Sequence, residues 1–176
     1  MIVITGFHRS GTSMTANLIE TAGYTMPNDM PPTSLNAKGY FEGIGIMCEN
    51  DRLMGRWDQP QLIDDTADMS LLDGFTAVKD PRFCVTLPAW DFDKVIKVYR
   101  DKRNACKSLS KASFLDYEEC LKLYDLYMEK LGKNTEGMDC ISVYYESLLE
   151  GDVKELENFI GNVDVSIIDK GLNHGV

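Results

Sequence analysis

Short apolar runs alternate along this chain with longer segments in which apolar residues recur every three or four positions. The short runs occupy residues 2–5, 75–79, 94–99 and 140–144. Runs of this length, rich in Ile and Val, predict strands that are buried on both faces. The longer segments between them have the periodicity of amphipathic helices. Strands that alternate with helices indicate a three-layer α/β fold, with a mainly parallel sheet of about four to five strands flanked by helices.

The clearest predicted helix begins after Asp116. Glu119 follows three residues later, which is the spacing of a capping box. We expect the apolar stripe of this helix to face the core; it consists of Tyr117, Leu121, Tyr124, Met128 and Leu131. Asp152 with Glu155 marks the start of the last helix in the same way, and Gly161 ends that helix.

The other helices are predicted from the same periodicity. Asp80 and Pro81 are a typical N-cap and first helical residue, so a helix is expected from there to Trp90 unless Pro88 shortens it. Further helices are expected at residues 14–22, 44–57 and 102–112. Residues 23–40, by contrast, are rich in Pro, Asn and Gly, and they predict a long loop that is a candidate lid.

The composition fits a single globular domain that covers residues 1–176. Hydrophobic residues make up 44% of the chain and charged residues 26%, as in ordinary globular proteins. No apolar run approaches the ~20 residues of a membrane span, and no signal-peptide pattern precedes the first strand. The five cysteines are scattered without a C-x-x-C pair, and only two histidines are present. We therefore expect a cytoplasmic protein with no membrane partner, disulfide framework or metal site.

The net charge of −10 disfavours a nucleic-acid partner. The charge is unevenly distributed, because residues 94–111 contain seven Lys or Arg and one acidic residue, a net charge of +6. A basic segment in an acidic chain suits a small polyanionic ligand. A solvated basic helix face is the alternative explanation.

An unusual segment, Gly-Phe-His-Arg-Ser-Gly-Thr-Ser, follows the first strand at residues 6–13. Its glycines let the backbone curl so that successive N–H groups point at an anion, and the N-terminus of the next helix adds its positive dipole end. The spacing matches the G-x-x-x-x-G-K-[ST] loop of nucleotide triphosphatases, except that Thr12 replaces the Lys. Arg9 supplies a positive charge inside the loop instead. The sequence thus predicts a P-loop-like fold with an anion-binding loop.

Three charged segments are expected to meet beyond the sheet. Parallel strands end at one edge, and ligands bind beyond the carboxyl ends of the strands. This rule brings together residues 6–13, 79–82 and 100–108.

Together these segments resemble the sulfotransferases that use 3′-phosphoadenosine 5′-phosphosulfate (PAPS). The loop at residues 6–13 resembles the 5′-phosphosulfate loop of that family, and Arg100 with Ser108 eight positions later resembles its 3′-phosphate motif. Residues 144–148, Tyr-Tyr-Glu-Ser-Leu, resemble its Y-E-x-L segment, and residues 156–161 resemble its late F-L-G helix. The resemblance covers most of the chain.

The resemblance implies that PAPS is the co-substrate and that a sulfuryl group passes in line, without a metal, to a hydroxyl or an amine. The loop would bind the 5′-phosphosulfate through His8, Arg9, Ser10, Gly11, Thr12 and Ser13. Arg9 would also neutralise the charge that builds up on the leaving phosphate. Arg100 and Ser108 would bind the 3′-phosphate.

Two further residues are candidates for catalysis by the same resemblance. Glu42 would take the proton of the acceptor, and Lys79 would contact the transferring sulfuryl group. Asp80 and His8 are the fallback bases. The glycine-rich basic segment that covers the 3′-phosphate in cytosolic members has only a weak counterpart here, at residues 170–171.

Two other functions remain open at this stage. One is a P-loop kinase of small molecules, which Thr12 disfavours and for which Asp101 is the nearest candidate magnesium ligand. The other is a nucleotide-binding module without catalytic activity. The acceptor, a small molecule or a glycan held beneath residues 25–41, is not identified by the sequence, and neither is the oligomeric state.

Overall fold

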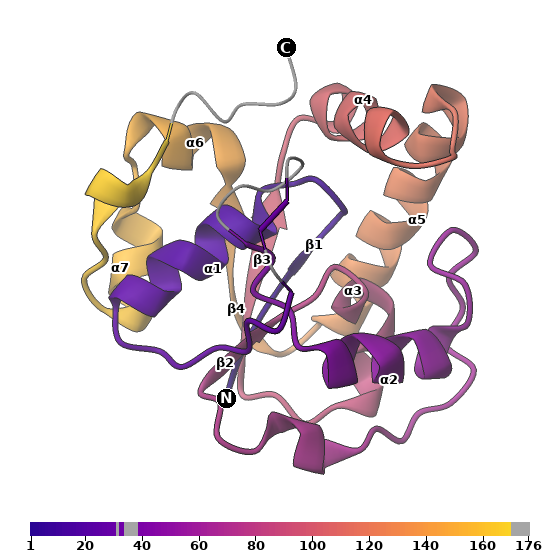
Figure 1. The fold of residues 1–176 in the computed structure, drawn as a ribbon, viewed down its shortest axis with the longest axis horizontal. Coiled ribbons are helices and arrows are strands. Elements are labelled where there is room, and N and C mark those ends of the chain that lie inside the picture. The colour runs from indigo at the N-terminus through magenta and orange to yellow at the C-terminus, as the bar shows by residue number, and fades with distance from the viewer. Residues whose placement is uncertain (31, 34–38, 170–176) are drawn as a thin grey trace.

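The computed structural model describes residues 1–30, 32–33 and 39–169. Its centre is a four-stranded sheet in the order β2-β1-β3-β4, in which every neighbouring pair is parallel (Figure 1). The strands are β1 (Ile2–Gly6), β2 (Ala77–Lys79), β3 (Lys94–Tyr99) and β4 (Asp139–Tyr144). The helices are α1 (Thr12–Thr21), α2 (Ile44–Met54), α3 (Phe83–Thr86), α4 (Lys102–Ala112), α5 (Tyr117–Asn134), α6 (Tyr145–Glu150) and α7 (Lys154–Ile160). The predicted α/β class and the parallel sheet are confirmed, with four strands.

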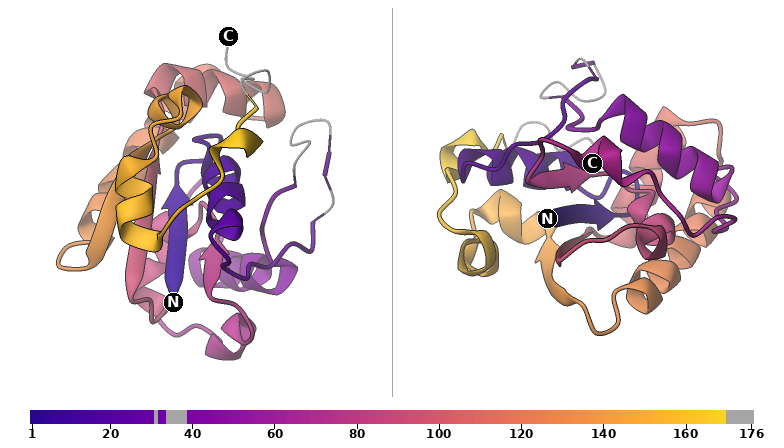
Figure 2. Two further views of the ribbon diagram at one scale, coloured as in Figure 1. Left: turned by 90° about the vertical axis from the view of Figure 1, so that its left-hand side faces the viewer. Right: turned by 90° about the horizontal axis from the view of Figure 1, so that it is seen from below.

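Successive residues of each strand enter opposite cores, as the two-residue period of a strand requires. Ile2 and Ile4 of β1 pack with α1, α6 and α7, whereas Val3 packs with α2 and α3. β3 repeats the pattern with Ile96 on the first side and Val95 on the second. Figure 2 shows the resulting layers, with α1, α6 and α7 on one side of the sheet and α3 and α5 on the other.

The strand order creates a crevice next to β1. The chain passes from β1 to β2 on one side, and then crosses to β3 on the other side of β1. Such a reversal of direction opens a space beyond the carboxyl end of the strand, between the two connections. The segment that follows β1, residues 7–11, enters this space.

The observed helices differ from the predicted ones in three places. α2 ends before Gly55, whose φ is 71°, and therefore does not extend to residue 57. The helix expected at residues 80–90 is a single turn, α3, followed by a 3₁₀ turn that contains Pro88. Because Pro88 has no N–H to donate, the α-helix does not continue through it. The sequence did not predict α6, which follows β4 without a break.

The capping box of α5 is confirmed, but the predicted core stripe of that helix is displaced. Asp116 accepts a hydrogen bond from the Glu119 N–H at 2.8 Å, and the Glu119 carboxylate accepts one from the Asp116 N–H at 2.8 Å. The fully buried residues of α5 are Cys120, Leu123, Tyr127 and Leu131. The predicted residues other than Leu131 are partly buried along the edges of this stripe. At α7 the N-cap is Val153 and not the predicted Asp152.

Parts of two predicted segments lie outside the described residues. The loop at 23–40 is described at residues 23–30, 32–33 and 39–40, where it contains no helix. Residues 170–171, the weak candidate for a 3′-phosphate cover, are not described. Within the described ranges, no helix combines the length and the apolar character that a membrane span needs.

Candidate functional site

The loop after β1 is curled by two residues with left-handed backbone conformations. Arg9 has a φ of 64° and Gly11 a φ of 94°. The Ser10 N–H donates to the Phe7 carbonyl oxygen at 3.1 Å and closes the turn between them. Gly11 is the N-cap of α1 and has no side chain to cap the first N–H groups of that helix. The curled loop and the helix N-terminus together favour an anion.

Both glycines of the loop are also required for space. A Cβ atom on Gly6 would lie 2.2 Å from the carbonyl oxygen of Val98 in β3, and one on Gly11 would lie 2.3 Å from the Tyr145 ring in α6. A close-packed interior cannot accept such contacts without moving. The motif glycines therefore allow the loop to touch β3 and α6 directly.

The end of β3 and helix α4 meet this loop. The Arg9 Nε donates to the Ser108 Oγ at 3.1 Å, and the Arg100 Nη1 donates to the Arg9 carbonyl oxygen at 3.0 Å. Arg100 and Ser108 are buried, and the Arg100 guanidinium lies over the Tyr145 ring at 4.4 Å. Burial lowers the pKa of Arg9, and Arg100 contributes to the same shift. Two neighbouring cations in a buried position are favourable for an anionic ligand.

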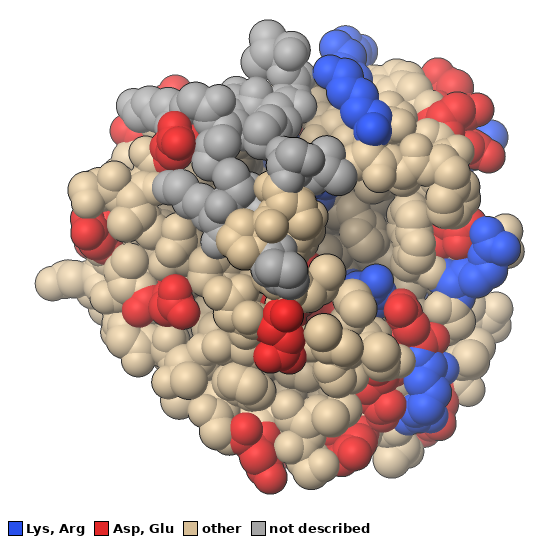
Figure 3. Space-filling model, in the orientation of Figure 1, with Lys and Arg blue, Asp and Glu red and all other residues tan. Residues whose placement is uncertain are grey.

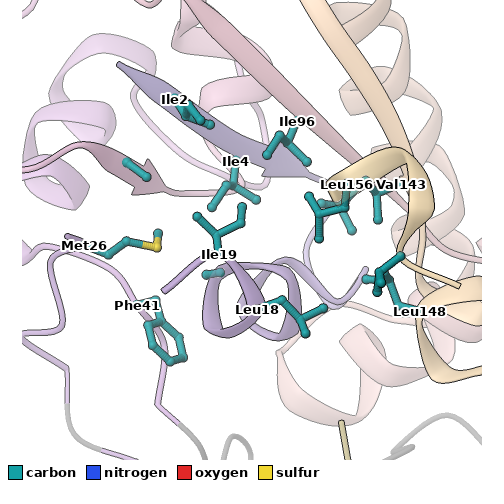
Figure 4. Packing of buried hydrophobic residues seen from close by; sticks show 14 residues of the cluster. Ile2, Ile4, Leu18, Ile19, Met26, Phe41, Ile96, Val143, Leu148 and Leu156 are labelled. Carbon is teal, nitrogen blue, oxygen red and sulfur yellow. The ribbon is translucent and has the colours of Figure 1, made fainter. Parts of the chain in front are cut away.

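Glu42 and Lys79 form a buried ion pair. Lys79 is the last residue of β2, and its Nζ contacts the Glu42 carboxylate and donates to the Tyr40 carbonyl oxygen at 2.9 Å. Phe41 lies between these two partners and has a φ of 54°. Its side chain is buried in the core cluster that also contains Met26 (Figure 4). The anchored Phe41 thus turns Glu42 towards the end of β2.

Asp80 and Arg82 belong to a network that braces the turn after β2. The buried Asp80 carboxylate accepts from the Arg82 N–H at 2.8 Å, from the Arg82 guanidinium at 3.1 Å and from the Asn50 amide at 3.1 Å. The Arg82 Nε also donates to Asp51 at 2.6 Å. Burial opposes the charge of Arg82, but Asp80 and Asp51 outweigh it and raise the pKa of Arg82. Asp80 does not line the cavity described below, which makes it a poor alternative base.

His8 connects the loop to the opposite wall of the site. Its Nε2 lies 3.1 Å from the Tyr127 hydroxyl, which donates its own proton to the Trp57 carbonyl oxygen at 3.0 Å. The His8 Nε2–H is therefore the donor to Tyr127. Burial, followed by the nearby Arg82, lowers the pKa of His8 to about 3. A neutral, weakly basic imidazole with this hydrogen bond orients Tyr127 and Trp57 and is unsuited to proton abstraction.

A cavity of about 410 Å³ connects these groups, a size typical of small-molecule sites. Its polar lining includes the loop after β1, Glu42, Lys79, Arg82 and Arg100. Its apolar lining includes Met14, Met30, Met47, Trp57 and Leu109. In Figure 3 the surface is hollowed between the regions labelled α2 and α4 in Figure 1, and both basic and acidic side chains border the hollow. The carboxyl ends of three strands thus open into one space.

Ser10 has a buried hydroxyl for which the described residues provide no hydrogen-bond partner. A buried polar group without a partner costs about 1–3 kcal/mol. An anion in the curled loop would bring acceptor oxygens to this region, close to the N–H groups of α1 and to Arg9. The residues present therefore fit a phosphate-bearing or sulfate-bearing ligand.

The basic segment at residues 94–111 does not form one surface. A strand and a helix share the segment, so its side chains point in different directions. Among the described residues, Arg100 is the only Lys or Arg of this segment that lines the cavity. Lys94 lies over an aromatic ring of α7, and Lys102 pairs with Asp125 at 2.7 Å. One buried guanidinium, and not the whole segment, is available to the ligand.

The structure brings most of the candidate residues to one cavity. Glu42, Lys79 and Arg100 line it with His8, Arg9, Gly11, Thr12 and Ser13, while Ser10 and Ser108 are buried and are not part of its lining. Sequence reasoning missed Tyr127, Trp57 and the role of Tyr145. Tyr145 stands in the quoted Y-E-x-L segment and could have been found there. Tyr127 gave no signal, because a buried aromatic residue on a helix resembles any other core residue. Trp57 lies after the end of α2 and belongs to no motif.

Comparison of the chain with protein-family models, with curated proteins and with solved structures finds no match. Among the described residues, no group of three or more His, Cys, Asp or Glu is placed to hold a metal ion. The function is therefore inferred from the geometry of the cavity and from the motifs that line it.

Proposed function

We propose that the protein is a sulfotransferase that moves a sulfuryl group from PAPS to a hydroxyl or an amine. The observation that carries the proposal is the contact of Arg9 with both Arg100 and Ser108. In the sulfotransferases that the sequence resembles, the first motif binds the 5′-phosphosulfate and the second binds the 3′-phosphate. One adenosine can join these two groups only where the two motifs lie side by side, as they do here.

Each phosphate of the nucleotide has a matching set of groups. The N–H groups at the start of α1 and the buried Ser10 hydroxyl suit the 5′-phosphate. The Arg100 guanidinium and the Ser108 hydroxyl, which both contact Arg9, suit the 3′-phosphate, because a planar guanidinium can bind a phosphate through two hydrogen bonds. The 3′-phosphate is the group that distinguishes PAPS from ATP.

Glu42 and Lys79 are the residues proposed for the transfer step. The acceptor oxygen would bond to sulfur while the bond from sulfur to the bridging phosphate oxygen breaks. Glu42 would take the acceptor proton, and Lys79 would neutralise the sulfuryl oxygens. Arg9 would stabilise the negative charge that the leaving adenosine 3′,5′-bisphosphate acquires. The contact between the Glu42 and Lys79 side chains supports a common location for the two roles.

A P-loop kinase is the main alternative, and two observations disfavour it. Thr12 stands where such a kinase needs a Lys that bridges two phosphates. Asp101, the nearest candidate for a magnesium ligand, is the N-cap of α4 and accepts a hydrogen bond from the Asn104 N–H at 2.9 Å. The Asp101 carboxylate therefore caps α4.

Calorimetric titration with adenosine 3′,5′-bisphosphate, AMP and magnesium ATP tests the donor. The bisphosphate should bind at least about tenfold more tightly than AMP, because hydrogen bonds to charged groups contribute about 1.5–3 kcal/mol. Arg100→Gln should abolish this preference. Lys102→Gln, which removes a half-buried charge outside the cavity, should retain the preference. Tighter binding of magnesium ATP than of the bisphosphate would overturn the proposal.

Release of the bisphosphate from PAPS, in the presence of a panel of acceptors, tests the transfer. Glu42→Gln should slow release by about 10²–10⁴-fold and leave bisphosphate binding unchanged. The variant keeps a carbonyl oxygen that can accept the hydrogen bond of Lys79, which limits damage to the fold. Binding of PAPS without transfer by the wild-type protein would favour the non-catalytic module.

A further inference from the structure

A second hollow adjoins the cavity at Trp57. It is an open groove of about 390 Å³ that is lined by Asp51, Gly55, Arg56, Trp57, Asp58 and Phe114. Trp57 lines both hollows, and Arg82 of the cavity wall is bonded to Asp51 of the groove. A ligand in the groove can therefore continue along Trp57 towards the proposed site of transfer.

The groove has a rigid aromatic surface. The Trp57 ring lies 5.1 Å from the His8 ring on the cavity side and 5.8 Å from the Phe114 ring on the groove side, centroid to centroid. Tyr127 fixes the Trp57 backbone through its hydrogen bond to the carbonyl oxygen. The Phe114 side chain is 71% exposed although it is large and apolar. An exposed aromatic ring next to a hollow marks a position where a ligand can bury it.

The charged groups of the groove are paired with one another or with the cavity wall. Arg56 binds Asp58 through two parallel hydrogen bonds, and Asp51 accepts from the Arg82 Nε at 2.6 Å. The hydrogen bonds from Arg56 also hold the pKa of Asp58 below its usual range. Paired charges offer fixed donors and acceptors with little net charge. They therefore suit the hydroxyl groups of a neutral ligand.

The surroundings of the groove disfavour an anionic ligand. Arg56, the cation that lines the groove, is already paired with Asp58, and Asp51 is paired with Arg82. The groove therefore offers an acidic glycan no excess positive charge. A flat aromatic ligand would cover the polar groups of the groove without satisfying them. A neutral sugar ring matches both kinds of surface, because it has an apolar C–H face for the aromatic rings and a rim of hydroxyls for the polar groups.

We propose that the groove binds a neutral oligosaccharide and that this oligosaccharide is the acceptor. One sugar ring lies on Trp57 against Phe114, and the next extends into the cavity towards Glu42. The identity of the acceptor rests on the proposed sulfotransferase function, whereas the binding of a neutral saccharide in the groove does not.

Tryptophan fluorescence during titration with maltohexaose, cellohexaose and chitohexaose, without nucleotide, tests this proposal. Trp57 is the accessible reporter, since Trp90 is buried and donates its indole N–H to Asn50. At least one of the three should bind with a Kd below about 10 mM. Phe114→Ala should weaken that binding by about threefold to tenfold. Ile63→Ala, which truncates a comparably exposed side chain outside the groove, should leave it unchanged.

Three results would overturn the proposal. The first is that none of the three saccharides binds. The second is that the Phe114→Ala protein binds them as well as the wild type does. The third is that 2-naphthol, used as an aromatic hydroxyl probe, displaces a bound saccharide, or that 2-naphthol quenches the Trp57 fluorescence while none of the saccharides does.

The bisphosphate titration separates this proposal from the one on which it builds. Bisphosphate binding without saccharide binding would refute the acceptor alone. Saccharide binding without bisphosphate binding would refute the sulfotransferase assignment and leave the saccharide site in place.

Discussion

Gly11→Ala is the substitution whose effect the structure specifies most closely. Gly11 has a φ of 94°, and an added Cβ atom would lie 2.3 Å from the Tyr145 ring. The left-handed conformation costs a residue other than glycine about 1–2 kcal/mol. Forcing a methyl group against a packed ring adds about 1–3 kcal/mol. The lower entropy of the unfolded alanine chain offsets about 0.4–1 kcal/mol, so the free energy of unfolding should fall by about 1–5 kcal/mol.

Gly23→Ala is the matched control for this substitution. Gly23 has a φ of 90°, but no atom lies within 4 Å of the position of its Cβ. Only the conformational cost applies there, and the net loss should be about 0.5–1.5 kcal/mol. The difference between the two variants therefore isolates the contact between the loop and Tyr145.

Equilibrium unfolding in urea, followed by circular dichroism, provides the measurement. Combining Gly11→Ala with Tyr145→Ala should reduce the cost of the glycine substitution by about 1–3 kcal/mol, because the ring that obstructs the methyl group is gone. If Gly11→Ala and Gly23→Ala differ by less than about 0.5 kcal/mol, the loop does not pack on α6 as described. The phosphate-binding geometry inferred from that packing would then be wrong as well.

Three other predictions concern the stability of the fold around the site. Burial lowers the pKa of His8 to about 3, so the unfolded chain takes up a proton there below pH ~6.5 and the folded chain does not. The free energy of unfolding of the wild-type protein should accordingly fall as the pH is lowered from about 6.5 towards 3. In urea unfolding, His8→Gln should reduce this pH dependence by up to about 1.4 kcal/mol per pH unit. Tyr127→Phe should lower the free energy of unfolding by about 1–3 kcal/mol, because the His8 N–H and the Trp57 carbonyl lose their hydrogen-bond partner. An unchanged midpoint of thermal unfolding would contradict this prediction. Asp116→Ala should lower the free energy of unfolding by about 1 kcal/mol, and Asp152→Ala, which does not remove an N-cap residue, should lower it by less. Equal losses in the two variants would argue against the capping box.

Most of the fold could be predicted because its signals are local. An apolar run of four to six residues predicts a buried strand, and Asp116 with Glu119 marks a helix start within a single turn. The errors occurred where local signals were ambiguous. Several apolar residues of α5 could face the core, and only the packing of the helix selected Tyr127 over Tyr124. α6 is too short for its periodicity to be recognised.

The candidate site was predictable as a set of motifs but not as an arrangement. The curled loop at residues 6–13 is a local pattern of glycines between a strand and a helix. The pairing of Glu42 with Lys79, 37 positions apart, has no local signal. The same is true of His8 and Tyr127, which are 119 positions apart. Of the basic residues at 94–111, the periodicity could not indicate which one faces the cavity, and only the resemblance to the 3′-phosphate motif singled out Arg100.

The sequence by itself determined the order of the strands and of most helices, the glycine loop at residues 6–13 and the capping box of α5, because each depends on the preferences of neighbouring residues. Only the tertiary structure decided that Arg9 contacts Arg100 and Ser108, and that Trp57 separates a cavity from a groove. These contacts join elements that are distant in the chain, and they form only when the strands align in parallel and the helices cover both faces of the sheet. Side-chain packing across those layers has no counterpart in the local pattern of residues.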